Sequence, residues 1–426
     1  MVKLGQRVIN GHLERTGVRL HYLEWNPDAD GRPAVLLLHG LSSNAAFWSR
    51  LAGQLPTRRL VALDQRAHGA SAAPEDGYQP AILAADAAAL VEELGLGPVV
   101  VAGHSWGASI GLQLAADRPD LVAGLAVLDG PVRAWSETGL TWDQAAQFMQ
   151  PPLPLYQDLE AALAEQRRYL KDAWADDLVE FVRSGLVAEG TGFRLPLTAA
   201  IRLQILQAMF FQPYKVLWTQ VRCPVLLVLA DGGGDSGFLD YKRRSAAAVA
   251  EQVPGTTVHW YPTGHDIPLE RPAEIAAELE RLCLRAAFAE VTSDILATDG
   301  DWTRATGYRD WTARDLLAHL SSTQSALPAV ARSRAEPDAE PAARFDSDRW
   351  NASQLRRRAE TTAAELKAEL DAGLKELDPI LAELPVGETI GAGTFAGEKA
   401  AAAMEHMVDH QREHLAELRR TLSADS

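Results

Sequence analysis

Short apolar runs in the first two-thirds of the chain, each bounded by Gly, Asp or Pro, constrain the fold more than any other feature. They are AVLLLHG (34–40), RLVALD (59–64), VVVAG (99–103), LAVLDG (125–130) and CPVLLVLAD (223–231). Runs this apolar predict strands that are buried on both faces. Helical patterns such as AILAADAAALVEELG (81–95) alternate with the runs, and this alternation predicts a parallel sheet covered by helices on both sides.

One long segment interrupts the alternation between residue 132 and about residue 220. It contains several helical stretches and many aromatic residues, and no strand is evident in it. An insertion of this size between two strands predicts a helical cap over the carboxyl edge of the sheet.

After residue 272 the pattern becomes wholly helical. Helices are predicted at 273–300, 312–333, 353–377 and 398–422, with the second interrupted by Pro328 and a polar loop at 335–350. These segments predict a four-helix bundle. We therefore expect two domains, an α/β domain at residues 1–285 and a bundle at 286–426.

Charge and composition exclude several function classes. The 426 residues carry a net charge of −16 and no basic run, so neither nucleic acid nor an anionic membrane is an expected partner. Two cysteines, Cys223 and Cys283, predict no disulfide framework. The first residues lack an apolar core of signal-peptide length, and no apolar run is long enough to span a bilayer, so we expect a cytoplasmic protein. The oligomeric state stays open, with a homo-oligomer among the alternatives.

The stretch GHSWGAS (103–109) places Ser105 in a G-x-S-x-G pattern between a predicted strand and a predicted helix. In that context the glycines allow a sharp turn that packs closely and exposes the serine hydroxyl. A second glycine turn, HGLSS (39–43), can aim the Leu41 amide at a carbonyl oxygen. The Trp106 amide, at the start of the helix, is the other expected oxyanion donor.

A base for this serine is predicted in TGHDIPLERP (263–272), which contains His265. The segment follows the last strand pattern, TVHWYP, from where a loop can return to Ser105. A triad in the chain order serine, acid, histidine suits a strand–turn–helix nucleophile and differs from the chymotrypsin order.

Several of these motifs together resemble the α/β-hydrolase superfamily over roughly residues 15–285: LLLHG, LDQRAHGAS, GHSWGAS, CPVLLVLAD and TGHDIPLERP. The resemblance implies an α/β-hydrolase fold and a Ser-His-acid triad, and it names no substrate. It leaves the acid open between Asp235, where the superfamily most often keeps it, and Asp129, an alternative location, with Asp231 as a third candidate. Ala67 stands where a glycine is common, so the geometry of that turn is expected to differ.

The predicted bundle contains a separate group of histidines. His410 and His414 are four residues apart and share a helix face, and His319 on another helix can supply a third ligand. Neutral imidazoles suit Zn or Ni, although histidines at this spacing also occur on solvated faces. The motifs DWTARDLLAHL and MVDHQREHLAELR resemble the DinB family, which includes mycothiol-dependent maleylpyruvate isomerases, over about residues 286–422. This resemblance implies the same three metal ligands.

The sequence therefore predicts a serine hydrolase for a small apolar ester, thioester or lactone, with no cofactor in the hydrolase domain. Two alternatives remain open. One is a metal-dependent thiol transferase or isomerase centred on the bundle, with a low-molecular-weight thiol as partner. The other is a non-hydrolytic tailoring or ligand-binding protein of natural-product metabolism on a hydrolase scaffold.

Overall fold

The computed structural model describes residues 7–149, 153–232, 236–335, 345–391 and 393–423. The chain forms two compact units, Met1–Leu279 and Glu280–Ser426. The division falls inside helix α11 (Pro272–Leu296), the same helix that contains the boundary predicted at residue 286. Within the described ranges, no helix combines the length and apolar character that crossing a bilayer requires.

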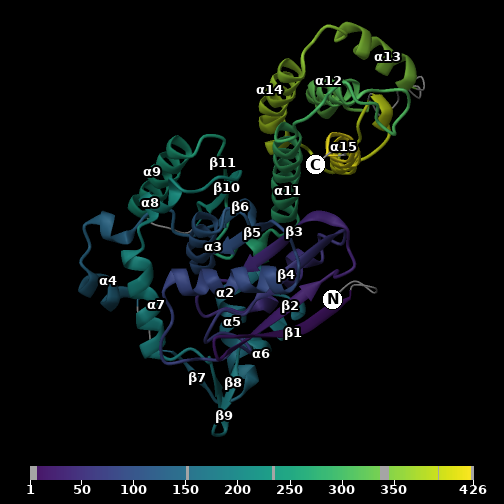
Figure 1. Cartoon of the computed structure of the whole chain (residues 1–426). Helices are drawn as coiled ribbons and strands as arrows, with labels where there is room; N and C mark the ends of the chain where they lie inside the picture. Colours follow the sequence, from purple (N-terminus) through teal and green to yellow (C-terminus); the bar gives the residue numbers. More distant parts are fainter. Residues whose placement is uncertain (1–6, 150–152, 233–235, 336–344, 392, 424–426) are drawn as a thin grey trace. The chain divides into compact units, whose positions relative to one another are not determined.

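In the described part of the first unit, the central sheet has eight strands in the order β1-β2-β4-β3-β5-β6-β10-β11 (Figure 1). They are β1 (Val8–Arg15), β2 (Val18–Trp25), β3 (Gly31–Leu38), β4 (Arg58–Leu63), β5 (Val99–His104), β6 (Val122–Leu128), β10 (Val225–Ala230) and β11 (Thr257–Tyr261). The apolar runs form β3, β4, β5, β6 and β10, which pair in parallel as predicted. The hairpin β1–β2 adds an antiparallel edge, and its partly exposed first strand lacks a comparable apolar run.

Helices lie between these strands or follow the last of them, and they complete the core. They are α1 (Ser49–Ala52), α2 (Pro80–Glu93), α3 (Trp106–Asp117), α9 (Ser236–Gln252) and α10 (Ile267–Glu270). Apolar side chains of α2 and α3 join those of the central strands in one buried cluster. The α/β-hydrolase fold expected from the sequence is therefore present.

The segment between β6 and β10 forms the expected cap. Its helices are α4 (Trp142–Met149), α5 (Leu159–Leu170), α6 (Val179–Ser184), α7 (Ala199–Phe211) and α8 (Tyr214–Trp218). The prediction that it lacks strands is wrong, because β7 (Leu155–Tyr156), β8 (Val187–Glu189) and β9 (Gly192–Arg194) form a small antiparallel sheet. Strands of two or three residues are too short to leave a periodic pattern.

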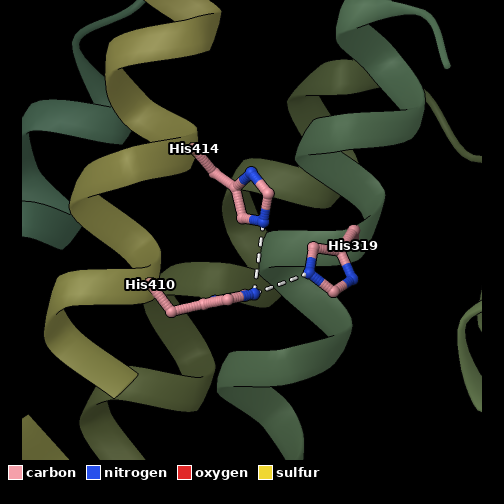
Figure 2. A group of neighbouring side chains, drawn as sticks. All are labelled: His319, His410 and His414. Carbon is pink, nitrogen blue, oxygen red and sulfur yellow. Dashed lines mark hydrogen bonds between the residues drawn. The ribbon is translucent and has the colours of Figure 1, made fainter. Parts of the chain in front are cut away.

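The second unit is a helical bundle. Its helices beyond α11 are α12 (Ala313–Arg332), α13 (Ser347–Arg357), α14 (Ala363–Ala382) and α15 (Ala400–Leu422). Two buried apolar clusters each draw residues from α11, α12, α14 and α15, which is the four-helix bundle that the sequence predicts. Figure 2 shows one place where α12 and α15 face each other, through His319 on α12 and His410 and His414 on α15.

Two details of the bundle differ from the prediction. Pro328 does not interrupt its helix, because α12 continues through it to Arg332. The predicted helix at 353–377 is divided, since α13 starts at Ser347 and a new helix starts after Thr362. The Thr362 side chain and that of Glu365 form a capping box, which fixes the start of α14.

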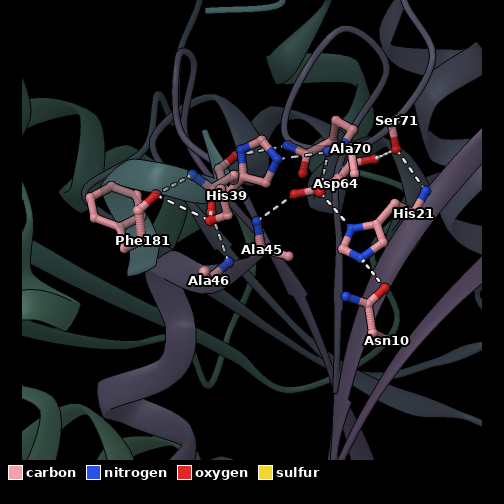
Figure 3. A network of polar contacts seen from close by, with 12 residues as sticks. Asn10, His21, His39, Ala45, Ala46, Asp64, Ala70, Ser71 and Phe181 are labelled. Atoms are coloured by element: carbon pink, nitrogen blue, oxygen red, sulfur yellow. Dashed lines mark hydrogen bonds and ion pairs between the residues drawn. The ribbon is translucent and has the colours of Figure 1, made fainter. Parts of the chain in front are cut away.

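A buried carboxylate, Asp64, joins three segments beside the sheet (Figure 3). Directly after β4, its Oδ2 accepts hydrogen bonds from His21 Nδ1 (2.6 Å) and the Ala70 amide (2.9 Å), and its Oδ1 accepts one from the Ala45 amide (2.6 Å). Burial opposes the charge, but these donors outweigh it and hold the pKa of Asp64 below its usual value. Gly69 is required here, because a Cβ would lie 1.9 Å from Asp64 Oδ2.

The same turn accommodates Ala67 without a glycine. Ala67 is buried and has a φ of 62°, in the left-handed region, and its amide donates to the Ala72 carbonyl at 3.0 Å. Ala67 thus adopts a backbone conformation that favours glycine, even though its side chain has a Cβ.

Replacing Asp64 by Asn is expected to cost about 3 kcal/mol of stability, because the amide cannot accept from all three donors and leaves buried groups unpaired. For a domain of this size that corresponds to a fall of roughly 6–12 °C in melting temperature, measured by calorimetry. The control is Asp120→Asn, since Asp120 is an exposed partner of Arg118. Equal shifts in the two variants would contradict the assigned role of Asp64.

Candidate active site

Ser105 lies in the turn between β5 and α3. Its backbone angles, φ 52° and ψ −119°, are those of a strained turn that exposes the side chain. The Ser105 amide donates to the Leu128 carbonyl at 3.0 Å, which ties the turn to the end of β6. The prediction that Ser105 occupies a sharp strand-to-helix turn agrees with this geometry.

Close packing explains the glycines on either side of Ser105. A Cβ on Gly107 would lie 2.1 Å from the Leu38 carbonyl oxygen, at the end of β3. A Cβ on Gly103 would lie 2.5 Å from the carbonyl oxygen of Gly107. Helix α3 can therefore start this close to the strands only with glycine at both positions.

The two predicted oxyanion donors belong to segments that meet at Ser105. Leu41 and Trp106 both line the cavity that contains Ser105. A Cβ on Gly40 would lie 3.2 Å from the Ser105 Cβ, so the glycine turn after β3 approaches the serine closely. The backbone of Gly40 and Leu41 is thus placed beside the candidate nucleophile.

Buried histidines fix the loop that contains Leu41. The Ser42 amide donates to His68 Nε2 at 3.0 Å, and the Gln65 amide donates to His39 Nε2 at 3.2 Å. Burial lowers the pKa of His68 to about 3 and also lowers the pKa of His39. Both rings are therefore neutral at pH 7, and each Nε2 can accept the hydrogen bond that holds the loop.

His265 and Asp129 form a hydrogen-bonded pair. His265 Nδ1 lies 2.7 Å from Oδ2 of Asp129, which directly follows β6. Burial disfavours the charge on both groups, but their mutual attraction outweighs it, so the pKa of Asp129 is lowered and the pKa of His265 is raised. The ring of His265 is 44% exposed, which leaves it accessible from the cavity.

The other candidate acids are placed differently. Asp231 follows β10 with an exposed side chain and lines a wider cavity of about 760 Å³, which Asp129 and His265 also line. Asp235 lies outside the described residues. Of the candidates that the structure describes, Asp129 is the one that contacts the His265 ring.

Lys242, on α9, is a site residue that sequence reasoning missed. Its Nζ lies 2.5 Å from Asp129 Oδ1 and 2.5 Å from the Ala230 carbonyl oxygen, and its side chain is only 15% exposed. Asp129 therefore has a partner on each carboxylate oxygen, the Lys242 ammonium on Oδ1 and the His265 ring on Oδ2. A lysine in a charged helical segment carries no motif that would distinguish it from a solvated one.

The candidate nucleophile and the His265–Asp129 pair line one cavity of about 390 Å³. Its apolar wall includes Leu41, Trp106, Val132, Leu206, Met209 and Leu229. Leu206 and Met209 belong to α7, so the cap closes over the carboxyl ends of β5 and β6. The arrangement can hold a small acyl compound with its carbonyl at Ser105.

The three histidines predicted as metal ligands converge in the bundle (Figure 2). His410 Nε2 lies 3.2 Å from both His319 Nε2 and His414 Nε2, and one ligand nitrogen from each ring lies within 4.8 Å of the others. His406 is separate, with a 60% exposed side chain that pairs with Glu398.

The surroundings of this histidine cluster (His319, His410 and His414) favour neutral rings. Burial, reinforced by the neighbouring imidazoles, lowers the pKa of His319 to about 3 and that of His414 to about 4. The Trp311 ring lies 5.3 Å from the His319 ring, and the Tyr308 ring lies 4.7 Å from that of His414. Neutral imidazoles are the metal-binding form, so the cluster fits a divalent ion that prefers nitrogen ligands.

Comparison with known proteins gives two family matches. Residues 35–278 match the Alpha/beta hydrolase family, and residues 283–423 match the Mycothiol maleylpyruvate isomerase N-terminal domain. The second match is DinB-like, as the bundle motifs predict.

Curated relatives and solved structures resemble the first unit. Lipase LipV of Mycobacterium tuberculosis is 37% identical over 37% of this chain and 57% of its own length. A 2-(acetamidomethylene)succinate hydrolase of Mesorhizobium japonicum is 40% identical over 23% of this chain and 35% of its own. The matched part of this chain thus spans between about a third and just over half of the length of these two relatives. The structure of an E-2-(acetamidomethylene)succinate hydrolase shares the fold, with 24% identity, a TM-score of 0.56, and coverage of 65% of this chain and 99% of that one.

Replacing Lys242 by Met is expected to raise the pKa of His265 further, because the ammonium lowers the proton affinity of the ring and is then lost. The measurement is an NMR titration of ¹³C-labelled histidine, with His265 assigned from a His265→Gln variant. Lys242→Arg should preserve the wild-type value. Lys215→Met, which removes an exposed lysine of the cap, is the matched control, and an identical titration in Lys242→Met would overturn the role of Lys242.

Proposed function

The chain belongs to the Alpha/beta hydrolase family, and we propose that it is an enzyme of hydrolase type whose first domain is a serine hydrolase that cleaves an acyl bond. The observation that carries this proposal is the common cavity of Ser105 and the His265–Asp129 pair. A nucleophile, a base and an orienting acid in one place are the requirements of acyl transfer through a serine.

In the proposed mechanism, Ser105 Oγ attacks the substrate carbonyl while His265 Nε2 takes the hydroxyl proton. Asp129 accepts from His265 Nδ1, which fixes the tautomer and stabilises the imidazolium. The Leu41 and Trp106 amides donate to the oxyanion. The proton on His265 passes to the leaving group, and a water molecule, activated by His265, then hydrolyses the acyl-enzyme and restores Ser105.

The proposed substrate is a small ester, thioester or lactone. A cavity of about 390 Å³ has room for a small acyl compound, and its leucine, methionine and valine side chains suit an aliphatic stem. No cofactor is needed for this chemistry.

The decisive test is labelling with a fluorophosphonate probe, together with hydrolysis of short 4-nitrophenyl esters. Wild type is expected to be labelled, and Ser105→Ala should lose both labelling and turnover. Asp129→Asn should lower kcat by about 10³–10⁴-fold because the His265 tautomer is no longer fixed.

Asp235→Asn and Asp231→Asn are matched controls and should remain within a few-fold of wild type. A larger loss in Asp235→Asn than in Asp129→Asn would move the acid to Asp235. Absence of both labelling and turnover in wild type would refute the hydrolase mechanism and favour a non-hydrolytic binding or tailoring role.

A second candidate function is supported by the histidine cluster of the bundle. We propose that His319, His410 and His414 hold one divalent ion, Zn or Ni, and that a low-molecular-weight thiol is the partner of this site. Three nitrogen ligands leave coordination positions for another group. A bound ion would act as a Lewis acid that favours the thiolate form of a thiol, the chemistry of a metal-dependent thiol transferase or isomerase.

Elemental analysis of the full chain, purified without chelators, should find about one metal ion per chain. His410→Ala should lose the metal and should also lose the rise in melting temperature that added Zn produces in wild type. His406→Ala, one turn earlier and outside the cluster, is the matched control. A metal-free wild type that gains no stability from Zn or Ni would contradict the proposal.

A further inference from the structure

Arg202, on the cap helix α7, lines the same cavity as Ser105 and His265. Its Nη1 donates to Ser42 Oγ at 2.7 Å, and its Nε is buried with no hydrogen-bond partner among the described residues. None of the ion pairs in the described part of the chain includes Arg202. A half-buried guanidinium whose Nε is shielded from solvent is commonly paired with a carboxylate.

The other charges of the cavity do not supply that carboxylate. The titratable side chains that line it are Asp129, Arg202, Tyr241, Lys242 and His265. Asp129 is the one carboxylate among them, and both of its oxygens are occupied, by Lys242 at 2.5 Å and by His265 at 2.7 Å. Burial keeps Tyr241 neutral by raising its pKa. No carboxylate that lines this cavity is therefore left to pair with Arg202.

The position of Arg202 relates this charge to the reacting carbonyl. Ser42, which accepts from the guanidinium, is the residue directly after Leu41, a proposed oxyanion donor. On α7, Arg202, Leu206 and Met209 recur at helical spacing and line the cavity together. A ligand on this face would meet an apolar surface and a cation in the cavity that also contains Ser105.

We propose that the substrate carries a carboxylate that binds Arg202, so that the enzyme cleaves a hemiester or hemithioester of a short dicarboxylic acid. This inference rests on the proposed serine hydrolase. The planar guanidinium offers parallel N–H donors that match a carboxylate, and a single unbalanced cation matches a single anion. The apolar wall then contacts the methylene groups between the two carboxyl carbons.

The test compares two esters of equal acyl length, mono-4-nitrophenyl glutarate and 4-nitrophenyl pentanoate, which differ in the terminal carboxylate. The readout is the ratio of their kcat/KM values. Wild type should favour the glutarate, and Arg202→Gln should reduce the ratio by about 10- to 100-fold, as expected for the loss of a charge-assisted pair. Arg202→Lys should give a ratio between those of wild type and Arg202→Gln, because lysine keeps the positive charge but lacks the parallel N–H donors of the guanidinium.

Two further variants separate binding from structure. Arg183→Gln removes an exposed cap arginine that pairs with Glu180 outside the cavity, and it should keep the wild-type ratio. Ser42→Ala removes the hydrogen bond that ties Arg202 to the loop and keeps the guanidinium. If Arg202 only ties the cap to this loop, Ser42→Ala will reduce the ratio as much as Arg202→Gln does, and the inference is overturned.

A binding measurement decides the inference independently of turnover. Monomethyl glutarate is titrated calorimetrically into Ser105→Ala and into the double variant Ser105→Ala/Arg202→Gln, with dimethyl glutarate as the neutral comparison. The carboxylate site is supported if the double variant binds monomethyl glutarate at least about tenfold more weakly than Ser105→Ala does. The inference is overturned if the two variants bind monomethyl glutarate with equal affinity, or if the protein that retains Arg202 binds dimethyl glutarate as well as it binds monomethyl glutarate. Failure of the serine mechanism appears separately, as a wild type that is neither labelled nor active on either ester.

Discussion

The closeness of helix α3 to the ends of β3 and β5 is the constraint on which the candidate active site depends. Gly103 and Gly107 allow this contact, since a Cβ at either position would overlap the backbone of a neighbouring segment. The contact places Ser105 in a strained turn and brings Gly40 beside it, so the candidate nucleophile and oxyanion loop are positioned by the same packing. The strain is stabilised by the rigid sheet beneath it, which a flexible loop could not provide.

Around Ser105, charge is distributed unevenly among few groups. Asp129 is shared between His265 and Lys242, so its carboxylate is ionised and held in one orientation. Lys242 moderates the effect of Asp129 on His265, because a carboxylate alone would raise the proton affinity of the ring further. Arg202 stands outside this arrangement with no counter-charge among the described residues, which separates the groups proposed for the reaction from the group proposed for substrate recognition.

The sequence predicted the features that leave a local pattern. Parallel strands, the Ser105 turn and the histidine spacing at His410 and His414 each follow from periodicity or from neighbours in the chain. The choice of acid could not be read in this way, because Asp129 and His265 are 136 residues apart and meet only through the pairing of β6, β10 and β11. Lys242 and Arg202 were missed for a related reason. Each lies in a helix without a recognisable motif around it, and only the fold distinguishes its side chain from a solvated charge. The small cap sheet and the division between α13 and α14 were missed because short elements give too little periodicity, although Thr362 and Glu365 carry a recognisable cap.

Ala67 has a consequence for how this part of the chain tolerates sequence change. Holding a non-glycine residue at a φ of 62° costs about 1 kcal/mol, yet the turn keeps its conformation. It can do so because contacts of Asp64, His21 and Ser71, together with the close approach of Gly69, hold the turn from several sides. The network therefore lets position 67 accept a side chain at a small cost in stability, while the loop beside Ser105 keeps its position; the residues that make the network, Asp64 and Gly69 among them, have no such tolerance.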